Sequence, residues 1–206
     1  MGLEMSTQFP FPGATTLGIR GKDSVVLASE KRLSYGYFVV SKNVRKVFKI
    51  TPTIGAACAG LVSDMQNLLK EITAAVNLYQ IENQRTASVN SVAKILSNYL
   101  FGSRYFPYIT ETIVGGFDST GAHVFVLDPL GSLIEDDFAV VGSGAEIAVG
   151  VLESSYRPDL SGPEIYDLAV RSMKAAIARD AGSGNGIDIL LIGPKGVVKD
   201  DSITIS

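Results

Sequence analysis

Acidic, basic and hydroxyl residues follow one another in the first quarter of this 206-residue chain, where their types and order could support chemistry. Residues 12–19 read Pro-Gly-Ala-Thr-Thr-Leu-Gly-Ile, and the segments 30–32 (Glu-Lys-Arg) and 45–46 (Arg-Lys) follow. A hydroxyl group attacks a substrate only when a neighbouring base accepts its proton, so such a grouping is typical of nucleophilic catalysis. The same residues also fit a simpler interpretation, in which a buried strand ends in surface charges and Glu30 forms an ordinary ion pair with Lys46.

The composition argues against several other kinds of site. The chain has one histidine, His123, so a catalytic histidine triad or a zinc site would depend on a single imidazole. The one cysteine, Cys58, excludes a disulfide within the chain and suits a reducing compartment such as the cytoplasm. We therefore expect no metal ion and no cofactor.

Charge and hydropathy limit the partners that we expect. The net charge is −3 without a basic stripe, which argues against nucleic acid. No apolar run reaches the roughly 18 residues needed to cross a membrane, and residues 1–13 lack the parts of a secretory signal. Hydrophobic residues make up 46% and charged residues 19%, so we expect much of the surface to be buried between subunits.

Short apolar runs predict strands in three parts of the chain. The runs at 16–20 and 24–29 flank Gly21-Lys22-Asp23, which predicts a β-hairpin. Further strands are predicted at 37–40, 46–50, 54–59, 112–117, 123–127, 138–141 and 187–192, and residues 197–198 are expected to pair with the last of these.

Apolar residues at steps of three and four predict four helices. The first is predicted from an N-cap at Ser63 to about residue 80, and the second from Ser88 to about residue 101. Their buried faces are predicted to consist of Met65, Leu68, Leu69, Ile72, Val76 and Tyr79 in the first, and Val92, Ile95, Leu96 and Tyr99 in the second. The third is predicted at 145–155, and the fourth starts with a capping box from Ser161 to Glu164. This order predicts an α+β fold with two stacked sheets between helical layers.

The combined spacing resembles that of proteasome β-type subunits, which are threonine peptidases of the N-terminal-nucleophile class. In that family a short propeptide ends in glycine, and a threonine becomes the new N-terminus after self-cleavage. A strand of small apolar residues then leads to an acid, an arginine and a lysine. Residues 57–64, 142–144 and 179–184 match later signatures of the family in the same order. The resemblance covers essentially the whole chain. It implies one β-type domain at 14–206 with a four-layer αββα sandwich, two mainly antiparallel sheets between helix pairs.

The resemblance also implies a role for each candidate site residue. Lys46 would favour loss of the proton from the nucleophilic hydroxyl, and Glu30 would keep Lys46 oriented and charged. The α-amine of the nucleophile would serve as the base, and Gly60 would present its backbone N–H to the oxyanion. The residues that would hold the amine in position are Ser143, Asp180 and Ser183. The residues that map onto the pocket for the substrate side chain are Leu33, Val44, Phe48, Cys58 and Val62, whose apolar character suggests cleavage after hydrophobic residues.

Simpler interpretations of these residues remain open at this stage. Gly60 could serve only as a turn residue, and the segment 142–144 could be only a connector. Asp180 could be an exposed charge near a helix end, and the five apolar pocket residues fit a core equally well.

The chain departs from the family pattern at the nucleophile. The fixed glycine of the family's Thr-Thr-x-x-Gly frame matches Gly18, which places Ala14 at the nucleophile position and Thr15 after it. Thr15 is not expected to substitute, because a shift of one residue turns a strand side chain to the opposite face. We therefore expect no peptidase activity and no cleavage between Gly13 and Ala14, so that the propeptide, residues 1–13, is retained.

Two explanations for Ala14 compete. The first is an active subunit in which threonine was deliberately replaced to trap the precursor, and the second is a naturally non-catalytic β subunit that shapes the chamber. The first is favoured, because every other site residue is present.

The resemblance also implies partners and a location. It implies assembly with proteasome α subunits and other β subunits in stacked seven-membered rings, unfolded polypeptides as substrates, an ATPase regulator and a cytoplasmic location. An α-type subunit fits less well, because Pro10 and Pro12 make residues 1–13 a poor helix. The bacterial two-ring relative also fits less well, because residues 29–32 have the form of the proteasome segment.

Overall fold

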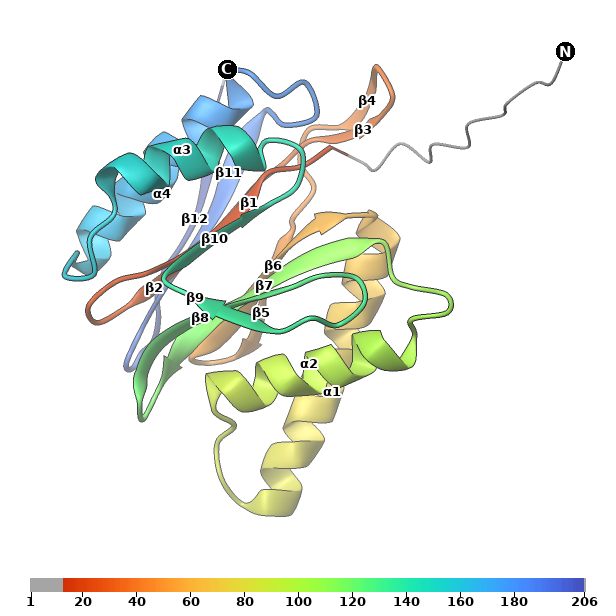
Figure 1. The fold of residues 1–206 in the computed structure, drawn as a ribbon, viewed down its shortest axis with the longest axis vertical. Helices are drawn as coiled ribbons and strands as arrows, with labels where there is room; N and C mark the ends of the chain where they lie inside the picture. Colours follow the sequence, from red (N-terminus) through yellow and green to blue (C-terminus); the bar gives the residue numbers. More distant parts are fainter. Residues whose placement is uncertain (1–12, 206) are drawn as a thin grey trace, which may run out of the picture.

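Two five-stranded antiparallel sheets lie face to face, and a pair of helices covers the outer face of each (Figure 1). The structure is a computed structural model that describes residues 13–205. The four layers are those predicted from the order of the elements. Residues 1–12 of the predicted propeptide lie outside the described residues.

The first sheet contains the strands nearest to both ends of the described chain. Its order is β10-β1-β2-β11-β12, and its strands are β1 (Thr16–Arg20), β2 (Val25–Glu30), β10 (Phe138–Val141), β11 (Gly186–Gly193) and β12 (Gly196–Thr204). The hairpin predicted around residues 21–23 joins β1 to β2, with Thr16 opposite Ser29. β12 pairs with β11, as predicted for residues 197–198.

The second sheet is a sequential meander with the order β5-β6-β7-β8-β9. Its strands are β5 (Val47–Thr51), β6 (Ile54–Gly60), β7 (Thr110–Asp118), β8 (Gly121–Leu127) and β9 (Ile134–Asp136). The strand predicted at 37–40 forms only in part. It is the short β4 (Phe38–Ser41), which pairs with β3 (Leu33–Tyr35) in a separate hairpin, because Tyr37 lies in the turn between them. This hairpin projects from the sandwich (Figure 1).

Helices α1 (Val62–Asn83) and α2 (Val89–Gly102) cover the second sheet, and α3 (Ala145–Ser155) and α4 (Gly162–Ile177) cover the first. The predicted N-cap at Ser63 is wrong. Leu61 occupies that position without a side-chain cap, and the helix begins directly after the end of β6. The cap at Ser88 and the capping box from Ser161 to Glu164 are confirmed.

Most side chains of the predicted helix faces are buried, whereas Tyr79 and Ile95 are half-buried and Tyr99 is exposed. Tyr99 is 38% exposed, and its hydroxyl donates to Glu71 Oε2 of α1 at 3.0 Å, so its polar tip turns outward. Tyr79 and Ile95 lie at the margin of the buried cluster under α1 and α2. No helix of residues 13–205 is long and apolar enough to span a membrane.

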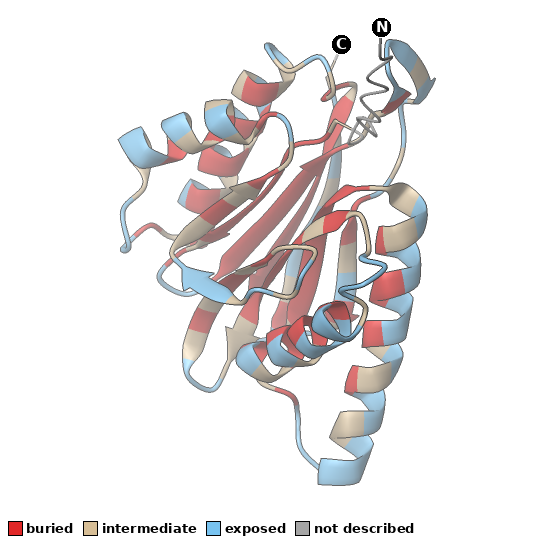
Figure 2. Ribbon diagram, turned by 45° about the vertical axis from the view of Figure 1, so that its right-hand side comes forward, coloured by how far each residue is buried: buried red, intermediate tan, exposed pale blue. Residues whose placement is uncertain are grey.

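Three buried clusters fill the spaces between the layers (Figure 2). β6 shows how one strand supplies two of them, because its side chains alternate between faces. Ala57 and Ala59 face the other sheet, together with Ala14 and Val141, whereas Ala56 and Cys58 pack under α1 and α2. The small residues of β6 let the two sheets approach closely at the end of the sandwich where the candidate site lies.

Candidate active site

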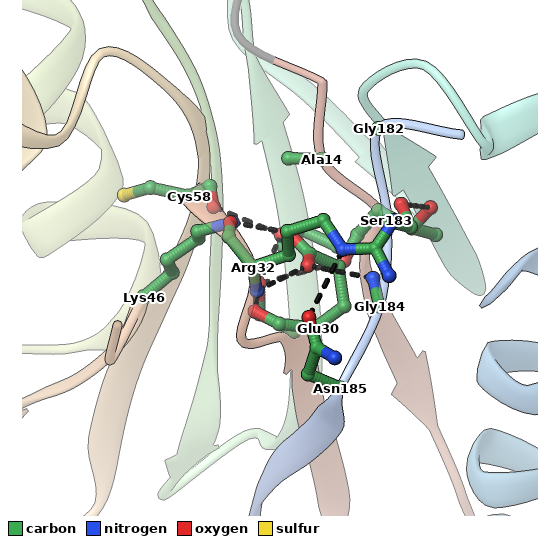
Figure 3. Close-up of polar contacts among 12 residues, drawn as sticks. Ala14, Glu30, Arg32, Lys46, Cys58, Gly182, Ser183, Gly184 and Asn185 are labelled. Carbon is green, nitrogen blue, oxygen red and sulfur yellow. Dashed lines mark hydrogen bonds and ion pairs between the residues drawn. The ribbon is translucent and has the colours of Figure 1, made fainter. Parts of the chain in front are cut away.

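A buried ion pair lies at the centre of the candidate site. Glu30 is the last residue of β2 and Lys46 directly precedes β5, so the pair joins the two sheets. Lys46 Nζ donates to Glu30 Oε1 and also to the carbonyl oxygen of Arg32 at 2.7 Å (Figure 3). The side chains of Lys46 and Glu30 are 2% and 0% exposed, which excludes a simple surface pair.

Backbone N–H groups complete the surroundings of Glu30. Its Oε2 accepts from the N–H of Arg32 at 2.6 Å and from the N–H of Gly184 at 3.1 Å. Burial raises the pKa of Glu30, whereas the charge of Lys46 and these hydrogen bonds act in the opposite direction. Each oxygen of this carboxylate therefore has a partner, and Lys46 is held in one orientation.

The nitrogen of residue 14 is held by a connected set of hydroxyl and carboxylate groups. The Ala14 N–H donates to Ser143 Oγ at 3.1 Å, and Ser143 Oγ–H donates to Asp180 Oδ2 at 2.7 Å. Ser183 Oγ–H donates to the same Asp180 oxygen at 2.6 Å. The structure thus brings together Ser143, Asp180 and Ser183, the residues predicted to hold the amine, and of these Ser143 contacts the backbone nitrogen of Ala14 directly.

The side chain of Thr15 points in a different direction from that of Ala14. Its Oγ1 lies 2.7 Å from Ser183 Oγ and close to Gly144. Ala14, in contrast, packs with Ala59 and Val141 in the cluster between the sheets. The alternation of strand faces predicted this difference in direction between Ala14 and Thr15.

Gly60 lies at the end of β6 with a backbone conformation that only glycine adopts readily. Its φ is +139°, and a Cβ atom there would collide with the carbonyl oxygen of Ile109. Backbone geometry therefore requires a glycine at this position.

The sheet register gives the direction of the Gly60 N–H. Leu61 N–H donates to the carbonyl of Ile109 at 2.7 Å, so Gly60 opposite Thr110 turns its own N–H away from β7. It lies on the same edge of β6 as the N–H of Cys58, which donates to the Lys46 carbonyl at 2.9 Å. The Gly60 N–H therefore points to the side of β6 on which Lys46 lies.

The predicted pocket residues divide into two groups by burial. Cys58 is fully buried under α1 and α2, and its Sγ lies 3.6 Å from Thr112 Oγ1. Burial raises the pKa of the Cys58 thiol to about 12, so this thiol is not a nucleophile at neutral pH. The other four residues are half-buried: Leu33, Val44, Phe48 and Val62. Phe48 packs against the same cluster as Cys58, and Val62 opens α1.

Arg32 is a site residue whose side-chain role the sequence interpretation did not predict. Its Nε donates to Asn185 Oδ1 at 3.0 Å, and its Nη1 donates to the carbonyl of Ala181 at 2.9 Å (Figure 3). The guanidinium therefore ties the loop that carries Ser183 and Gly184 to the end of β2. Residues 13–205 contain no group of three or more His, Cys, Asp or Glu side chains that could hold a metal ion.

Comparisons with known proteins show the family that this chain resembles. A family model described as Proteasome subunit matches residues 11–192. Proteasome subunit beta 1 of Hyperthermus butylicus is 51% identical over 181 residues, which cover 87% of this chain and 89% of the relative. Proteasome subunit beta 2 of Caldivirga maquilingensis is 47% identical over 196 residues, or 95% and 98% of the two chains. Proteasome subunit beta 1 of Cenarchaeum symbiosum is 48% identical over 185 residues, or 90% and 95%.

Proposed function

The chain belongs to the proteasome subunit family, and from this premise we propose that it is a β subunit of a 20S-type core whose threonine-peptidase site lacks only its nucleophile. The observation that carries the proposal is the connected arrangement around residue 14. Ser143, itself bound to Asp180, accepts from the nitrogen of residue 14. The buried ion pair of Lys46 and Glu30 lies at the same end of the sandwich.

The chemistry follows when residue 14 is threonine with a free α-amine. The amine accepts the hydroxyl proton, while Ser143 fixes the amine in position as it fixes the Ala14 nitrogen. The hydroxyl oxygen attacks the substrate carbonyl, and the Gly60 N–H donates to the resulting oxyanion. One such donor contributes roughly 3–4 kcal/mol to transition-state stabilisation. The amine then protonates the leaving amine, and water hydrolyses the acyl-enzyme.

Ala14 removes the first of these steps. A methyl group cannot attack a peptide bond, and it cannot attack the bond between Gly13 and Ala14 either. We expect turnover to fall by about four to six orders of magnitude and residues 1–13 to remain attached to the domain at 14–206. Retention would make the chain a trapped precursor.

The completeness of the remaining site favours a replaced threonine over a long-inactive site. Glu30, Lys46, Gly60 and Asp180 are all present, and a long-inactive site would have no chemical reason to keep them. The second candidate is a structural β subunit that supports active neighbours, and it is favoured only by Ala14 itself.

Restoring the hydroxyl distinguishes these two candidates. We expect particles with Ala14→Thr to lose residues 1–13, by intact mass, and to cleave fluorogenic peptides after hydrophobic residues. Ala14→Val is the matched control, because valine has the shape of threonine without its hydroxyl, and it should stay unprocessed and inactive. Assembled Ala14→Thr particles without activity would refute the peptidase proposal and favour the structural subunit.

The proposal includes the partners that the family implies: α subunits and other β subunits in stacked heptameric rings, unfolded polypeptide substrates, an ATPase regulator and a cytoplasmic location. Exposed aromatic side chains support assembly, because Tyr37 and Phe38 of the β3–β4 hairpin and Tyr105 and Phe106 after α2 are 70–108% exposed. Particle mass with and without α subunits tests this part.

A further inference from the structure

We propose that Glu111 is a positioning residue of the site: its carboxylate holds the turn at Gly142 and Ser143, and through Ser143 it places the nitrogen of residue 14. The inference rests on the proposed function, because that nitrogen matters only as the base of the reaction. Glu111 lies in β7, outside the segments that the sequence interpretation used.

The contact that carries the inference joins the two sheets. Glu111 Oε2 accepts from the N–H of Gly142 at 3.0 Å, and Gly142 directly follows the end of β10 in the other sheet. The donor and the acceptor therefore come from opposite sides of the sandwich. This contact fixes the end of one sheet against the other beside residue 14.

The register of β7 explains why an acidic side chain points there. Glu111 pairs with Ala59, whose side chain faces the space between the sheets, and Ile113 two residues later faces the same space. Paired residues in antiparallel strands share a face, so Glu111 is also directed toward the first sheet. An acid on this face, at the half-buried end of an otherwise apolar cluster, suggests a purpose other than packing.

The turn that Glu111 holds is fitted closely around residue 14. Gly142 has φ +96°, and a Cβ atom there would collide with the carbonyl oxygen of Ala14. Ser143 accepts from the Ala14 N–H, and the Gly144 N–H donates to the Ala14 carbonyl at 3.3 Å. Three successive residues of the turn thus lie against one residue, and the N–H of the first is held by Glu111.

Loss of this contact should displace Ser143 without removing any group that touches the reacting atoms. The amine would then be less often in line with the hydroxyl, which lowers the rate of the chemical step. Substrate binding would change little, because the Glu111 carboxylate binds the turn at Gly142, which carries none of the predicted pocket residues. The expected signature is a lower kcat at an unchanged KM, together with slower self-cleavage.

The contact itself can be tested in the chain as it stands, without activity. Labelling with ¹³C-carbonyl valine and ¹⁵N-glycine selects the glycines that follow a valine, which are Gly115, Gly142 and Gly150. We expect one of these three amide protons to move upfield in Glu111→Ala, where it loses its acceptor, and to move much less in Glu111→Gln, whose amide oxygen can still accept. If none of the three amide protons moves in Glu111→Ala, the contact and the inference with it are refuted.

The positioning role is tested in Ala14→Thr particles. Glu111→Ala should lower kcat by about tenfold, the effect of losing one hydrogen bond of typical strength, with KM within about twofold. Glu111→Gln should keep kcat within about threefold, because its amide oxygen can still accept from Gly142. Glu82→Ala, which removes an exposed carboxylate at the far end of α1, is the matched control and should match the parent.

These measurements distinguish failure of the positioning role from failure of the proposed function. Equal kcat in Glu111→Ala and its active parent would make the contact a simple structural tie and overturn the inference, as would an equal loss in Glu111→Gln and Glu111→Ala. Inactive Ala14→Thr particles would refute the proposed function and the positioning role together. If Glu111→Ala does not assemble, the Glu111→Gln kinetics and the amide spectra of the unassembled chains still decide the inference.

Discussion

Replacing Lys46 by methionine should strongly destabilise the fold, because it leaves the carboxylate of Glu30 buried without its counter-charge. Methionine is close to lysine in length and shape, so the change removes the ammonium group with little change in packing. Both side chains are almost completely shielded from water. Removing one partner of such a buried pair typically costs about 3–5 kcal/mol, and we expect a loss of that size in the free energy of unfolding near pH 8.

The loss should be smaller at low pH, and its sign follows from the pKa of Glu30. Burial already raises this pKa, and Lys46 is the main influence that lowers it, so Lys46→Met raises it further. A carboxyl group whose pKa is higher in the folded chain than in the unfolded chain loses stability as the pH rises through the folded value. The destabilisation should therefore be largest above that pKa and should diminish as the pH falls toward 5.

Urea denaturation of the full chain at pH 5 and pH 8 measures both effects. The double variant Lys46→Met/Glu30→Gln is the matched control. The amide oxygen of the glutamine can still accept from the N–H groups of Arg32 and Gly184, but the negative charge of the carboxylate is absent. The double variant should be more stable than Lys46→Met at pH 8 and should lose the pH dependence. A loss that is equal at the two pH values, or that Glu30→Gln does not relieve, would refute this reasoning.

Three further substitutions or reactions test other parts of the structure. Gly60→Ala should destabilise the chain by about 2 kcal/mol or more in denaturation, because φ +139° and the Ile109 carbonyl leave no room for Cβ; wild-type stability would contradict this geometry. Cys58, with a thiol pKa of about 12, should resist iodoacetamide at pH 8 until the chain is unfolded, as followed by mass spectrometry. Ser161→Ala should cost about 1 kcal/mol of unfolding free energy through the lost capping box, whereas Ser63→Ala should cost almost nothing; equal effects would contradict the assigned helix starts.

The elements marked by a periodic pattern of apolar residues were predictable from the sequence. Apolar residues at steps of three and four mark α1, α2 and α4, and Ser161 with Glu164 carries its own start signal. The start of α1 was not predictable in the same way. The chain passes from β6 into α1 within two residues, so the sheet fixes the first turn and Ser63 is not needed as a cap. Tyr99 was misplaced because a tyrosine at an apolar step can still turn its hydroxyl outward to Glu71.

The candidate site was predictable where it depends on side-chain types and unpredictable where it depends on backbone groups. Ser143, Asp180 and Ser183 could be named from their order, and the structure brings them together. The Gly184 N–H that binds Glu30 has no signal in the sequence, since every non-proline residue carries the same donor. Glu111 could not be found either, because its partner Gly142 is 31 residues away and in the other sheet.

The buried pair of Glu30 and Lys46 is itself an argument about why the rest of the site is intact. Moving two charges out of water is costly, and replacing a buried ion pair with apolar residues is often neutral or stabilising. A chain under selection for stability alone therefore has little reason to keep this buried pair between the two sheets, supported by two backbone N–H groups and the Arg32 carbonyl. A site whose lysine must remain charged and oriented does have such a reason. This reasoning supports our proposal that Ala14 replaces the nucleophile of an otherwise complete site. The test is the double variant Lys46→Met/Glu30→Gln in particles that carry Ala14→Thr. If this variant is stable and assembles but stays inactive, the pair is needed for the chemistry and not for the structure.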